Sequence, residues 1–332
     1  MNFFVNNPAL RDAWSPVAEP ADIAPGPLGV RLLGQDLVLW RDDSSALTAA
    51  LDRCPHREAP LSIGCVENGS LACAYHGWKF GEEGRCVNIP SASSSEAVIP
   101  PAAHLLALDV QERYGLVWVC PGKPPGDIAT IEQDDDPAFR RINTGVELWR
   151  TSATRMVDNF LDRSHFPWVH TGTIGDGLDP RVPRFTLVKL DDHFTGYEYE
   201  VDANNPTEAS VTSGSDEETV HRHMTTGFHL PTLVRSTIMY EDGLEHIILM
   251  ASTPVDDTTA LFTFVIWRND DHSLDAEAVI AFDRAIGAED RVMLEKVPGV
   301  LPMGQKALAS VQSDKASVEW RRQLAALLDL SD

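Results

Sequence analysis

Two short groups of cysteine and histidine stand near the beginning of a chain that has only five cysteines and eleven histidines among its 332 residues. Cys54 and His56 form the first group, and Cys73 and His76 form the second, with sixteen residues between His56 and Cys73. Thiolate and imidazole bind transition metals, and two loops that face each other across a hairpin could present all four donors. Such a set suits a tetrahedral zinc ion or a 2Fe-2S cluster in which histidines replace the cysteines on one iron.

A second group of ligand-type side chains lies in the segment DNFLDRSHFPWVH, residues 158–170. At 100° per residue, Asn159, Asp162 and His165 fall on one stripe of a helix. Pro167 lacks an amide N–H and disfavours helix in the residue before it, so we expect the helix to end near His165 and His170 to fold back beside it. Two histidines with one carboxylate make the facial triad of nonheme iron(II) oxygenases.

The carboxylate of such a triad is expected from a helix over residues 273–297, with Ser273 or Asp275 as its cap. Asp290 falls inside the apolar stripe of this helix, where a carboxylate is costly to bury unless a cation receives it. Asp283 lies seven residues earlier on nearly the same face. Periodicity therefore leaves both Asp290 and Asp283 open as the third ligand.

Both groups resemble the motifs of one protein family. The first, followed by Gly77 and Trp78, resembles the cluster motif of Rieske-type oxygenases and ferredoxins, and its order differs from that of the familiar zinc fingers. The segment NFLDRSHFPWVH resembles the mononuclear iron motif of Rieske oxygenase α subunits, and the sequence EDR around Asp290 looks like the family's third-ligand segment. This similarity favours Asp290 over Asp283.

The resemblance also implies what individual residues do. Asp162 would hydrogen-bond a cluster histidine of a neighbouring subunit, expected to be His76, and Asn159 would lie close to the iron. The family usually has glycine directly after CPHR, where this chain has Glu58. The metal ligands would be Cys54, His56, Cys73 and His76 for the 2Fe-2S cluster, and His165, His170 and Asp290 for the mononuclear iron(II).

What the resemblance implies as a whole is the terminal component of a Rieske nonheme iron monooxygenase or dioxygenase. Such a component takes O2 and electrons from NAD(P)H, through a separate reductase with or without a ferredoxin, and works as a homotrimer. Its small α-only members hydroxylate or oxidatively demethylate aromatic, heterocyclic or alkaloid-like compounds. Two alternatives stay open: a Rieske electron carrier fused to a noncatalytic ligand-binding domain, and a structural zinc protein.

The elements that must hold these groups divide into two domains. Short β-branched and aromatic segments with turn signals between them predict an antiparallel β domain over residues 1–125, the Rieske domain. A stretch rich in Pro, Gly and Asp, residues 121–139, reads as the connection. Residues 126–332 alternate strand and helix patterns, which predicts an α+β catalytic domain with a START-like helix-grip fold, an antiparallel sheet wrapped on a long helix.

Composition excludes several classes of partner. A net charge of -23 and a pI near 4.7 repel phosphate backbones and anionic lipid surfaces, so neither nucleic acid nor membrane is expected. The opening MNFFVNNPALRDAW has no basic region of a signal peptide, and no apolar run reaches the length of a membrane span. An odd number of cysteines argues for a reducing compartment. We expect a cytoplasmic protein.

Weaker expectations concern packing and the substrate pocket. Cys65 has no ligand-type partner at loop spacing and is expected to pack as a small buried hydrophobe. His221, His223 and His229 lie in or near a strand and share one face of it if no bulge intervenes. They are either candidates to orient a polar substrate or exposed to solvent. Apolar residues of the second domain that are candidates to line the pocket are Met250, Phe264, Trp267, Phe282 and Ile286.

Overall fold

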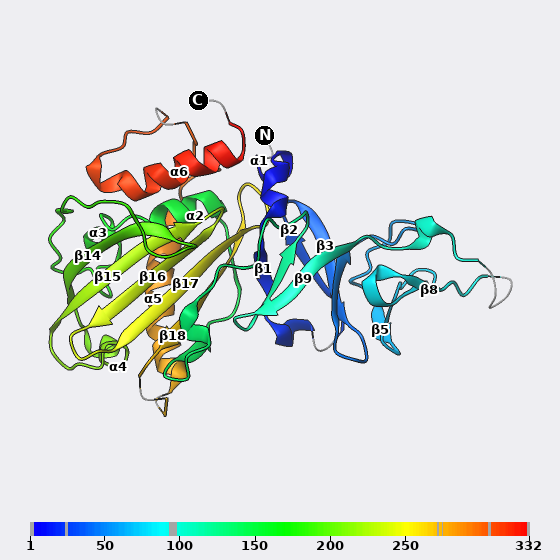
Figure 1. The fold of residues 1–332 in the computed structure, drawn as a ribbon, viewed down its shortest axis with the longest axis horizontal. Helices are drawn as coiled ribbons and strands as arrows, with labels where there is room; N and C mark the ends of the chain where they lie inside the picture. The colour runs from blue at the N-terminus through cyan, green and yellow to red at the C-terminus, as the bar shows by residue number, and fades with distance from the viewer. Residues whose placement is uncertain are drawn as a thin grey trace. The chain divides into compact units, whose positions relative to one another are not determined.

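The computed structural model describes residues 3–23, 26–92, 98–270, 272–273, 275–304 and 307–330, apart from the side chains of residues 208 and 211. The chain divides into two compact units, Met1–Ile128 and Ala129–Asp332. In the described ranges, no helix is long and apolar enough to cross a lipid bilayer. Both units are built mainly from antiparallel strands, which confirms the predicted α+β class (Figure 1).

The first unit contains two sheets. A six-stranded sheet has the order β1-β10-β9-β4-β3-β2, and a four-stranded sheet has the order β5-β6-β7-β8. The first hairpin turns at Leu33 and Gly34, whose φ values of 51° and 75° are the positive values that a two-residue hairpin turn needs. The strands are β1 (Ser15–Ala18), β2 (Leu28–Leu32), β3 (Gln35–Arg41), β4 (Leu47–Leu51), β5 (Cys65–Glu67), β6 (Ser70–Ala72), β7 (Lys79–Phe80), β8 (Cys86–Asn88), β9 (Ala107–Arg113) and β10 (Leu116–Cys120), and a short helix α1 (Phe3–Asn6) precedes them.

The second unit is an eight-stranded antiparallel sheet with helices. The sheet has the order β11-β18-β17-β16-β15-β14-β13, and β12 also pairs with β18. Its strands are β11 (Arg140–Asn143), β12 (Glu147–Trp149), β13 (Val188–Lys189), β14 (Thr195–Asn204), β15 (Thr219–His229), β16 (Leu233–Tyr240), β17 (Glu245–Pro254) and β18 (Ala260–Arg268). The helices are α2 (Ala153–Phe160), α3 (Phe166–Val169), α4 (Ser210–Ser213), α5 (Ala276–Leu294) and α6 (Lys315–Leu327).

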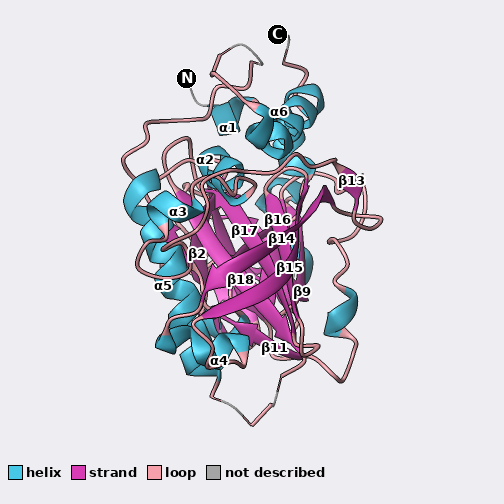
Figure 2. Ribbon diagram, turned by 90° about the vertical axis from the view of Figure 1, so that its left-hand side faces the viewer, coloured by secondary structure: helices cyan, strands magenta, loops and turns pink. Residues whose placement is uncertain are grey.

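Helix α5 runs along one face of this sheet (Figure 2), as the helix-grip prediction requires. Its N-cap is Asp275, whose carboxylate accepts a hydrogen bond from the backbone N–H of Glu277 at 3.0 Å. Helix α6 lies above α2 and the sheet in Figure 1, and its Trp320 is fully buried and donates its indole N–H to the carbonyl of Pro231 at 2.9 Å. The space between the sheet and α5 is where the sequence analysis places the mononuclear iron site.

The predicted helix through His165 is wrong in its extent. Helix α2 ends at Phe160, and a separate short helix, α3, begins at Phe166 with Pro167 in its first turn. The interruption has a local cause, because the carboxylate of Asp162 accepts hydrogen bonds from both the backbone N–H (2.8 Å) and the hydroxyl (2.9 Å) of Ser164. Such side-chain bonds compete with the helical backbone ladder. Proline is well tolerated in a first helical turn, where its missing N–H would have no partner.

Candidate metal centres and the adjoining cavity

The two Cys/His loops of the first unit have the same backbone design. In each, the cysteine N–H donates to the carbonyl five residues later, and the N–H four residues later donates back to the cysteine carbonyl. The residue at the fourth position has positive φ in both loops, 60° at Glu58 and 70° at Gly77. These four bonds are Cys54 to Ala59 (2.8 Å), Glu58 to Cys54 (2.9 Å), Cys73 to Trp78 (2.9 Å) and Gly77 to Cys73 (2.9 Å).

The four donors of these loops are arranged as two pairs. The rings of His56 and His76 have centroids 4.4 Å apart, and the thiol of Cys73 is near enough to that of Cys54 to raise its pKa. Among the described residues, these four do not form a group of three or more donors that converge on one point. One tetrahedral zinc ion would need all four together. A thiol pair beside an imidazole pair instead fits a 2Fe-2S cluster with cysteines on one iron and histidines on the other.

The surroundings of the loops fit a bound cluster as well. Trp78 stacks on His56 with ring centroids 4.7 Å apart and planes 6° apart. His56 Nδ1 and Trp78 Nε1 are buried with no hydrogen-bond partner among the described residues. Burial, with a contribution from the neighbouring Cys73 thiol, raises the pKa of Cys54 to about 11. A thiolate at this position therefore needs the positive charge that a metal supplies.

Two neighbouring residues differ from simple expectation. Cys65 is exposed, so the prediction that it packs as a buried hydrophobe is wrong; it opens β5, the edge strand of the four-stranded sheet, and its Sγ lies 3.5 Å from Glu67 Oε1. Glu58 has the left-handed backbone that glycine adopts without strain. Its side chain is exposed and pairs with Arg53, so no ligand is displaced.

In the second unit, His165, His170 and Asp290 converge on one point. The two imidazole Nε2 atoms are 3.1 Å apart, and Asp290 Oδ1 lies 3.3 Å from Nε2 of His165 and 3.4 Å from Nε2 of His170. His170 and Asp290 are buried, and His165 is nearly so. Three donor atoms so close together need a proton or a metal ion between them, since three lone pairs facing one another would repel. Two histidines and one carboxylate fit iron(II).

Each member of this triad is oriented by a neighbour. Asn159 Nδ2 donates to Asp290 Oδ1 at 2.9 Å, and Asp162 Oδ2 lies 3.4 Å from His165 Nδ1. Asn159 thus contacts one candidate ligand and Asp162 another, while the expected contact of Asp162 with a neighbouring subunit stays a prediction. A carboxylate on the outer nitrogen of a ligating imidazole fixes the ring and its tautomer.

His170 is held by Glu289, a contact that the sequence analysis did not single out. Glu289 Oε2 lies 3.1 Å from His170 Nδ1 and accepts the hydroxyl of Thr173 at 2.7 Å. Its other oxygen accepts the backbone N–H of Gly172 at 2.9 Å, and a Cβ on that glycine would lie 2.7 Å from Glu289 Oε1. The one sign of this role in the sequence is that Glu289 directly precedes the candidate ligand Asp290.

The electrostatics of the triad follow from these neighbours. Burial alone would lower the pKa of His165, but hydrogen bonds to the carboxylates of Asp162 and Asp290 raise it to about 9. For His170, burial outweighs the attraction of Asp290, and the pKa falls below its usual value. The pKa of Asp162 is also lowered, because the bonds from His165 and Ser164 exceed the effect of burial.

Asp283, the alternative carboxylate, is directed elsewhere. Its Oδ2 lies 3.4 Å from Nε2 of His246, a histidine of β17 with no exposed surface. The described residues form one group of three or more metal-type donors, and that group contains Asp290 but not Asp283. The structure therefore favours Asp290 as the third ligand.

A cavity of about 130 Å³ adjoins the triad between the sheet and α5. Of the predicted lining residues, Met250, Phe282 and Ile286 face it. Phe264 instead lines a smaller adjoining hollow of about 90 Å³. Trp267 lines neither hollow, because it lies on the opposite side of β18 and donates its indole N–H to Asp134 at 2.8 Å.

The three histidines of β15 do not face the cavity. Strand alternation puts them on the outer face of the sheet, where His221 and His223 pair with Glu200 and His229 Nδ1 lies 3.0 Å from the carbonyl of His193. The suggestion that they orient a substrate is therefore wrong. Arg222, between the first two, points inward and lines the cavity with Thr226 and Tyr240.

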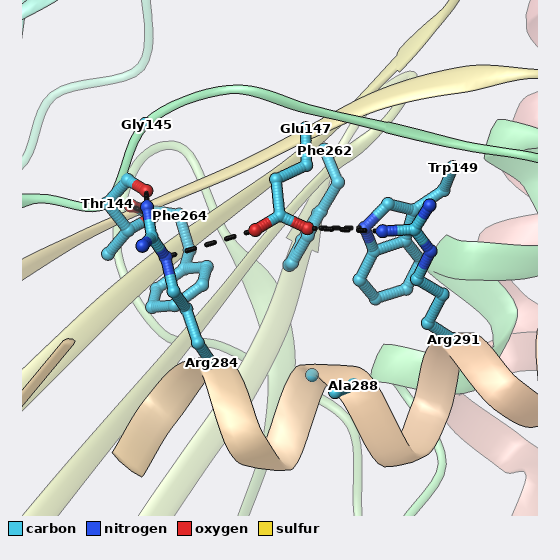
Figure 3. Close-up of a pocket in the computed structure, with 10 residues that line it drawn as sticks. Thr144, Gly145, Glu147, Trp149, Phe262, Phe264, Arg284, Ala288 and Arg291 are labelled. Atoms are coloured by element: carbon cyan, nitrogen blue, oxygen red, sulfur yellow. Dashed lines mark hydrogen bonds and ion pairs between the residues drawn. The ribbon is translucent and has the colours of Figure 1, made fainter. Parts of the chain in front are cut away.

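A separate cleft of about 230 Å³ lies on another side of α5 (Figure 3). Arg284 and Arg291 project from the helix toward Glu147, at 3.9 Å and 3.5 Å respectively, and Arg291 also pairs with Glu295 at 2.8 Å. The cations of this cleft are therefore compensated by carboxylates.

Comparisons with known proteins agree with both sites. Residues 13–106 match the family "Rieske [2Fe-2S] domain", and residues 149–330 match "Vanillate O-demethylase oxygenase C-terminal domain". Methylxanthine N1-demethylase NdmA of Pseudomonas putida is 30% identical over 96% of this chain and 89% of its own length. Methylxanthine N3-demethylase NdmB of the same organism is 32% identical over 94% of this chain and 88% of its own.

A solved structure, that of Pseudomonas putida CBB5 NdmA with caffeine, superposes with a TM-score of 0.84 and 26% identity, and covers 98% of this chain and 93% of the other. The similarity therefore covers both units. A Rieske cluster domain is followed by an oxygenase domain, in the predicted order. The chain belongs to the Rieske nonheme iron oxygenases, as the oxygenase component that carries the 2Fe-2S cluster and the mononuclear iron.

Proposed function

We propose that this chain is a demethylating monooxygenase, which removes a methyl group from oxygen or nitrogen on a small aromatic or heterocyclic compound. The observation that carries the proposal is the triad of His165, His170 and Asp290 at the wall of a mostly apolar cavity. An apolar cavity of about 150 Å³ admits benzene, so the volume of about 130 Å³ found here favours a substrate with about one aromatic ring. The similarity to enzymes named methylxanthine demethylases favours demethylation over ring hydroxylation.

The balance of the reaction fixes what must reach the site. A methyl ether, one O2, two electrons and two protons give the free hydroxyl compound, formaldehyde and water. When bound, the iron would activate the O2 with electrons that arrive from the cluster. His165, His170 and Asp290 would hold it at the cavity wall, and the apolar side chains of Phe160, Phe166 and Ile286 would exclude bulk water from the methyl group.

Product analysis tests this assignment. The purified protein, supplied with NADH and a reductase, should release about one formaldehyde per O2 consumed from an active methoxy or N-methyl compound. Metal analysis should find about three irons per chain, two in the cluster and one at the triad. A product that keeps its methyl group and gains a ring hydroxyl would overturn demethylation. About two irons per chain would favour an electron carrier instead.

The electron path is a further part of the proposal. Cys54, His56, Cys73 and His76 would hold the cluster, which a separate reductase, with or without a ferredoxin, reduces one electron at a time from NAD(P)H. Free cysteines throughout the chain suit the reducing cytoplasm, where we place the protein.

We further propose a homotrimer in which Asp162 contacts His76 of the partner subunit. The side chain of Asp162 keeps 23% of its surface exposed while it holds His165, and His76 is exposed on its loop. Beside that loop, Tyr75 and Ile63 expose 64% and 67% of their surfaces, which is unusual for large apolar side chains unless a partner covers them. Head-to-tail contacts of this kind close into rings.

The variant Asp162→Asn tests the electron path, because it keeps the shape of the side chain and removes its charge. Cluster and iron should stay near full occupancy, while electron transfer from prereduced cluster to iron in a single turnover slows by orders of magnitude. The matched control is Asp179→Asn, an exposed acid whose ion pair among the described residues is with Arg181, and this variant should change nothing. If Asp162→Asn transfers electrons normally, or if the protein is active as a monomer, the proposed electron path between subunits is wrong.

A further inference from the structure

One buried cation in the cavity has no anionic partner. Three arginines are buried among the described residues, Arg222, Arg268 and Arg321. Arg268 pairs with Asp270 at 2.8 Å, and Arg321 pairs with Asp158 at 3.4 Å. Arg222, which is 4% exposed, has no ion pair with any described residue, and its Nε is buried without a hydrogen-bond partner. Burying an unpaired charge is costly, so a ligand that supplies the anion is the natural complement.

The position of Arg222 in the sheet aims it into the cavity. Arg222 on β15 lies opposite Tyr240 on β16, and its guanidinium carbon is 5.4 Å from the centroid of that ring. This contact orients the cation but leaves its hydrogen-bond donors unused. The hydroxyl of Tyr240 is also buried without a partner. Two donors from neighbouring strands therefore face the same end of the cavity.

His246 and Asp283 mark the same polar end. His246 Nε2 and Asp283 Oδ2 are buried and lack hydrogen bonds of good geometry, although they lie 3.4 Å apart. Asp283 precedes Asp290 by seven residues on α5, which at 1.5 Å per residue places this end about 10 Å from the iron ligand along the helix. A single aromatic ring spans such a distance when it carries a methyl-bearing atom at one end and a polar group at the other.

The arginines of the outer cleft provide the contrast. Arg284 and Arg291 share Glu147, and Arg291 has Glu295 in addition (Figure 3). Carboxylates of the fold itself therefore compensate both cations. Arg222 differs because the carboxylate nearest the cavity's polar end, that of Asp283, faces His246.

We propose that Arg222, assisted by the hydroxyl of Tyr240, binds the anionic group of the substrate, so that the natural substrate is a methylated aromatic acid with its carboxylate at the far end of the cavity from the triad. This rests on the proposed demethylase function and names its substrate class. Arg222 is then a residue that determines specificity. Neutral N-methyl heterocycles, which leave the guanidinium unpaired, bind poorly.

Binding to the holoprotein, measured by calorimetry without O2 or reductant, tests the anionic subsite apart from turnover. The probes are 3- and 4-methoxybenzoate and the corresponding methoxybenzamides, which have nearly the same shape without the charge. The wild-type protein should bind at least one acid about tenfold more tightly than its amide. In Arg222→Gln, Kd for the acid should rise by about 10- to 100-fold, because a hydrogen bond to a charged group is lost, while Kd for the amide stays within about threefold.

Two controls separate recognition from structure. Arg235→Gln removes a cation of the neighbouring strand that pairs with Asp191 outside the cavity, and it should leave the acid preference intact. Because Arg222 breaks no ion pair when replaced, Arg222→Gln should keep or raise the thermal midpoint of the ligand-free protein. A lower midpoint with equal loss of acid and amide binding would assign Arg222 a structural role and overturn the proposal.

The remaining outcomes are also decisive. Equal affinity of the wild-type protein for acid and amide, or binding of neither, overturns the anionic subsite. If a neutral N-methyl compound yields formaldehyde while the acids do not bind, the demethylase stands and the subsite fails. If the acids bind through Arg222 but no methylated compound yields formaldehyde, the subsite stands and the demethylase fails.

Discussion

Loading the mononuclear site with iron(II) should release a proton at neutral pH. A ligating imidazole must offer a lone pair, so it must be neutral at the nitrogen that binds the metal. In the metal-free site, Asp162 and Asp290 raise the pKa of His165 to about 9, and His165 is therefore protonated at pH 7. His170 has a lowered pKa and is already neutral there. Metal binding at pH 7 should thus displace about one proton, from His165.

The size of the effect follows from the pKa. At pH 7, two units below a pKa of about 9, only about one His165 in a hundred is free of its proton, so the apparent affinity for iron(II) is about a hundredfold below its limiting value. Iron(II) and the proton compete for His165, so the affinity for iron(II) rises as the proton is lost. The rise is about tenfold per pH unit from pH 7 toward 9, and it levels off above the pKa of His165. The penalty at pH 7 corresponds to about 3 kcal/mol.

Anaerobic calorimetry measures the proton directly. Chelator-treated protein that retains the cluster absorbance is titrated with iron(II) at pH 7, in two buffers of different ionisation enthalpy, and the difference in heat gives the number of protons released. Asp162→Asn is the informative variant, because it removes the carboxylate that holds the proton on His165, and it should release clearly less. An affinity that does not change between pH 7 and 9, with no proton released, would refute this account of the triad.

Three further outcomes follow from the same contacts. Asp290→Ala should lose the mononuclear iron while Asp283→Ala keeps it, as iron content per cluster will show; the reverse result would identify Asp283 as the ligand. Glu289→Gln should weaken iron(II) binding by about 10- to 100-fold in anaerobic titrations, because the partner of a ligating histidine is altered, and an unchanged affinity would remove its positioning role. Glu58→Gly should stabilise the first unit by about 1 kcal/mol against denaturant, followed by cluster absorbance, because glycine has no left-handed strain; a loss of stability would contradict the strain argument.

Metal-ligand candidates were the part of this protein most accessible from its sequence. Cys54 and His56, or Cys73 and His76, are neighbours along the chain, so a single short loop suffices to place each pair. The pairing of thiol with thiol and imidazole with imidazole was not accessible, because it depends on how the two loops face each other. That pairing is what separates a two-iron cluster from a single zinc ion.

The other wrong or open predictions have two causes: side-chain hydrogen bonds that compete with the helical backbone, and tertiary contacts that a sequence does not show. Helical periodicity put Asn159 and Asp162 on one stripe, but it could not show that the Asp162 carboxylate would take the N–H of Ser164 and that the helix would end at Phe160. Asp283 and Asp290 share a helix face, and only the partners opposite them, His246 for one and the histidine pair for the other, tell them apart.

Strand β15 shows the same limit most clearly. The sequence TVHRHMTTGFH alternates two sets of side chains, and alternation alone does not reveal which set faces the covering helix. The histidines drew attention because imidazole is a familiar catalytic group, yet exposed acids on β14 already partner His221 and His223. Arg222 occupies the buried register between them, where no described carboxylate meets it. Arginine is seldom fully buried without a partner, so its appearance in the covered register is the stronger indication of function.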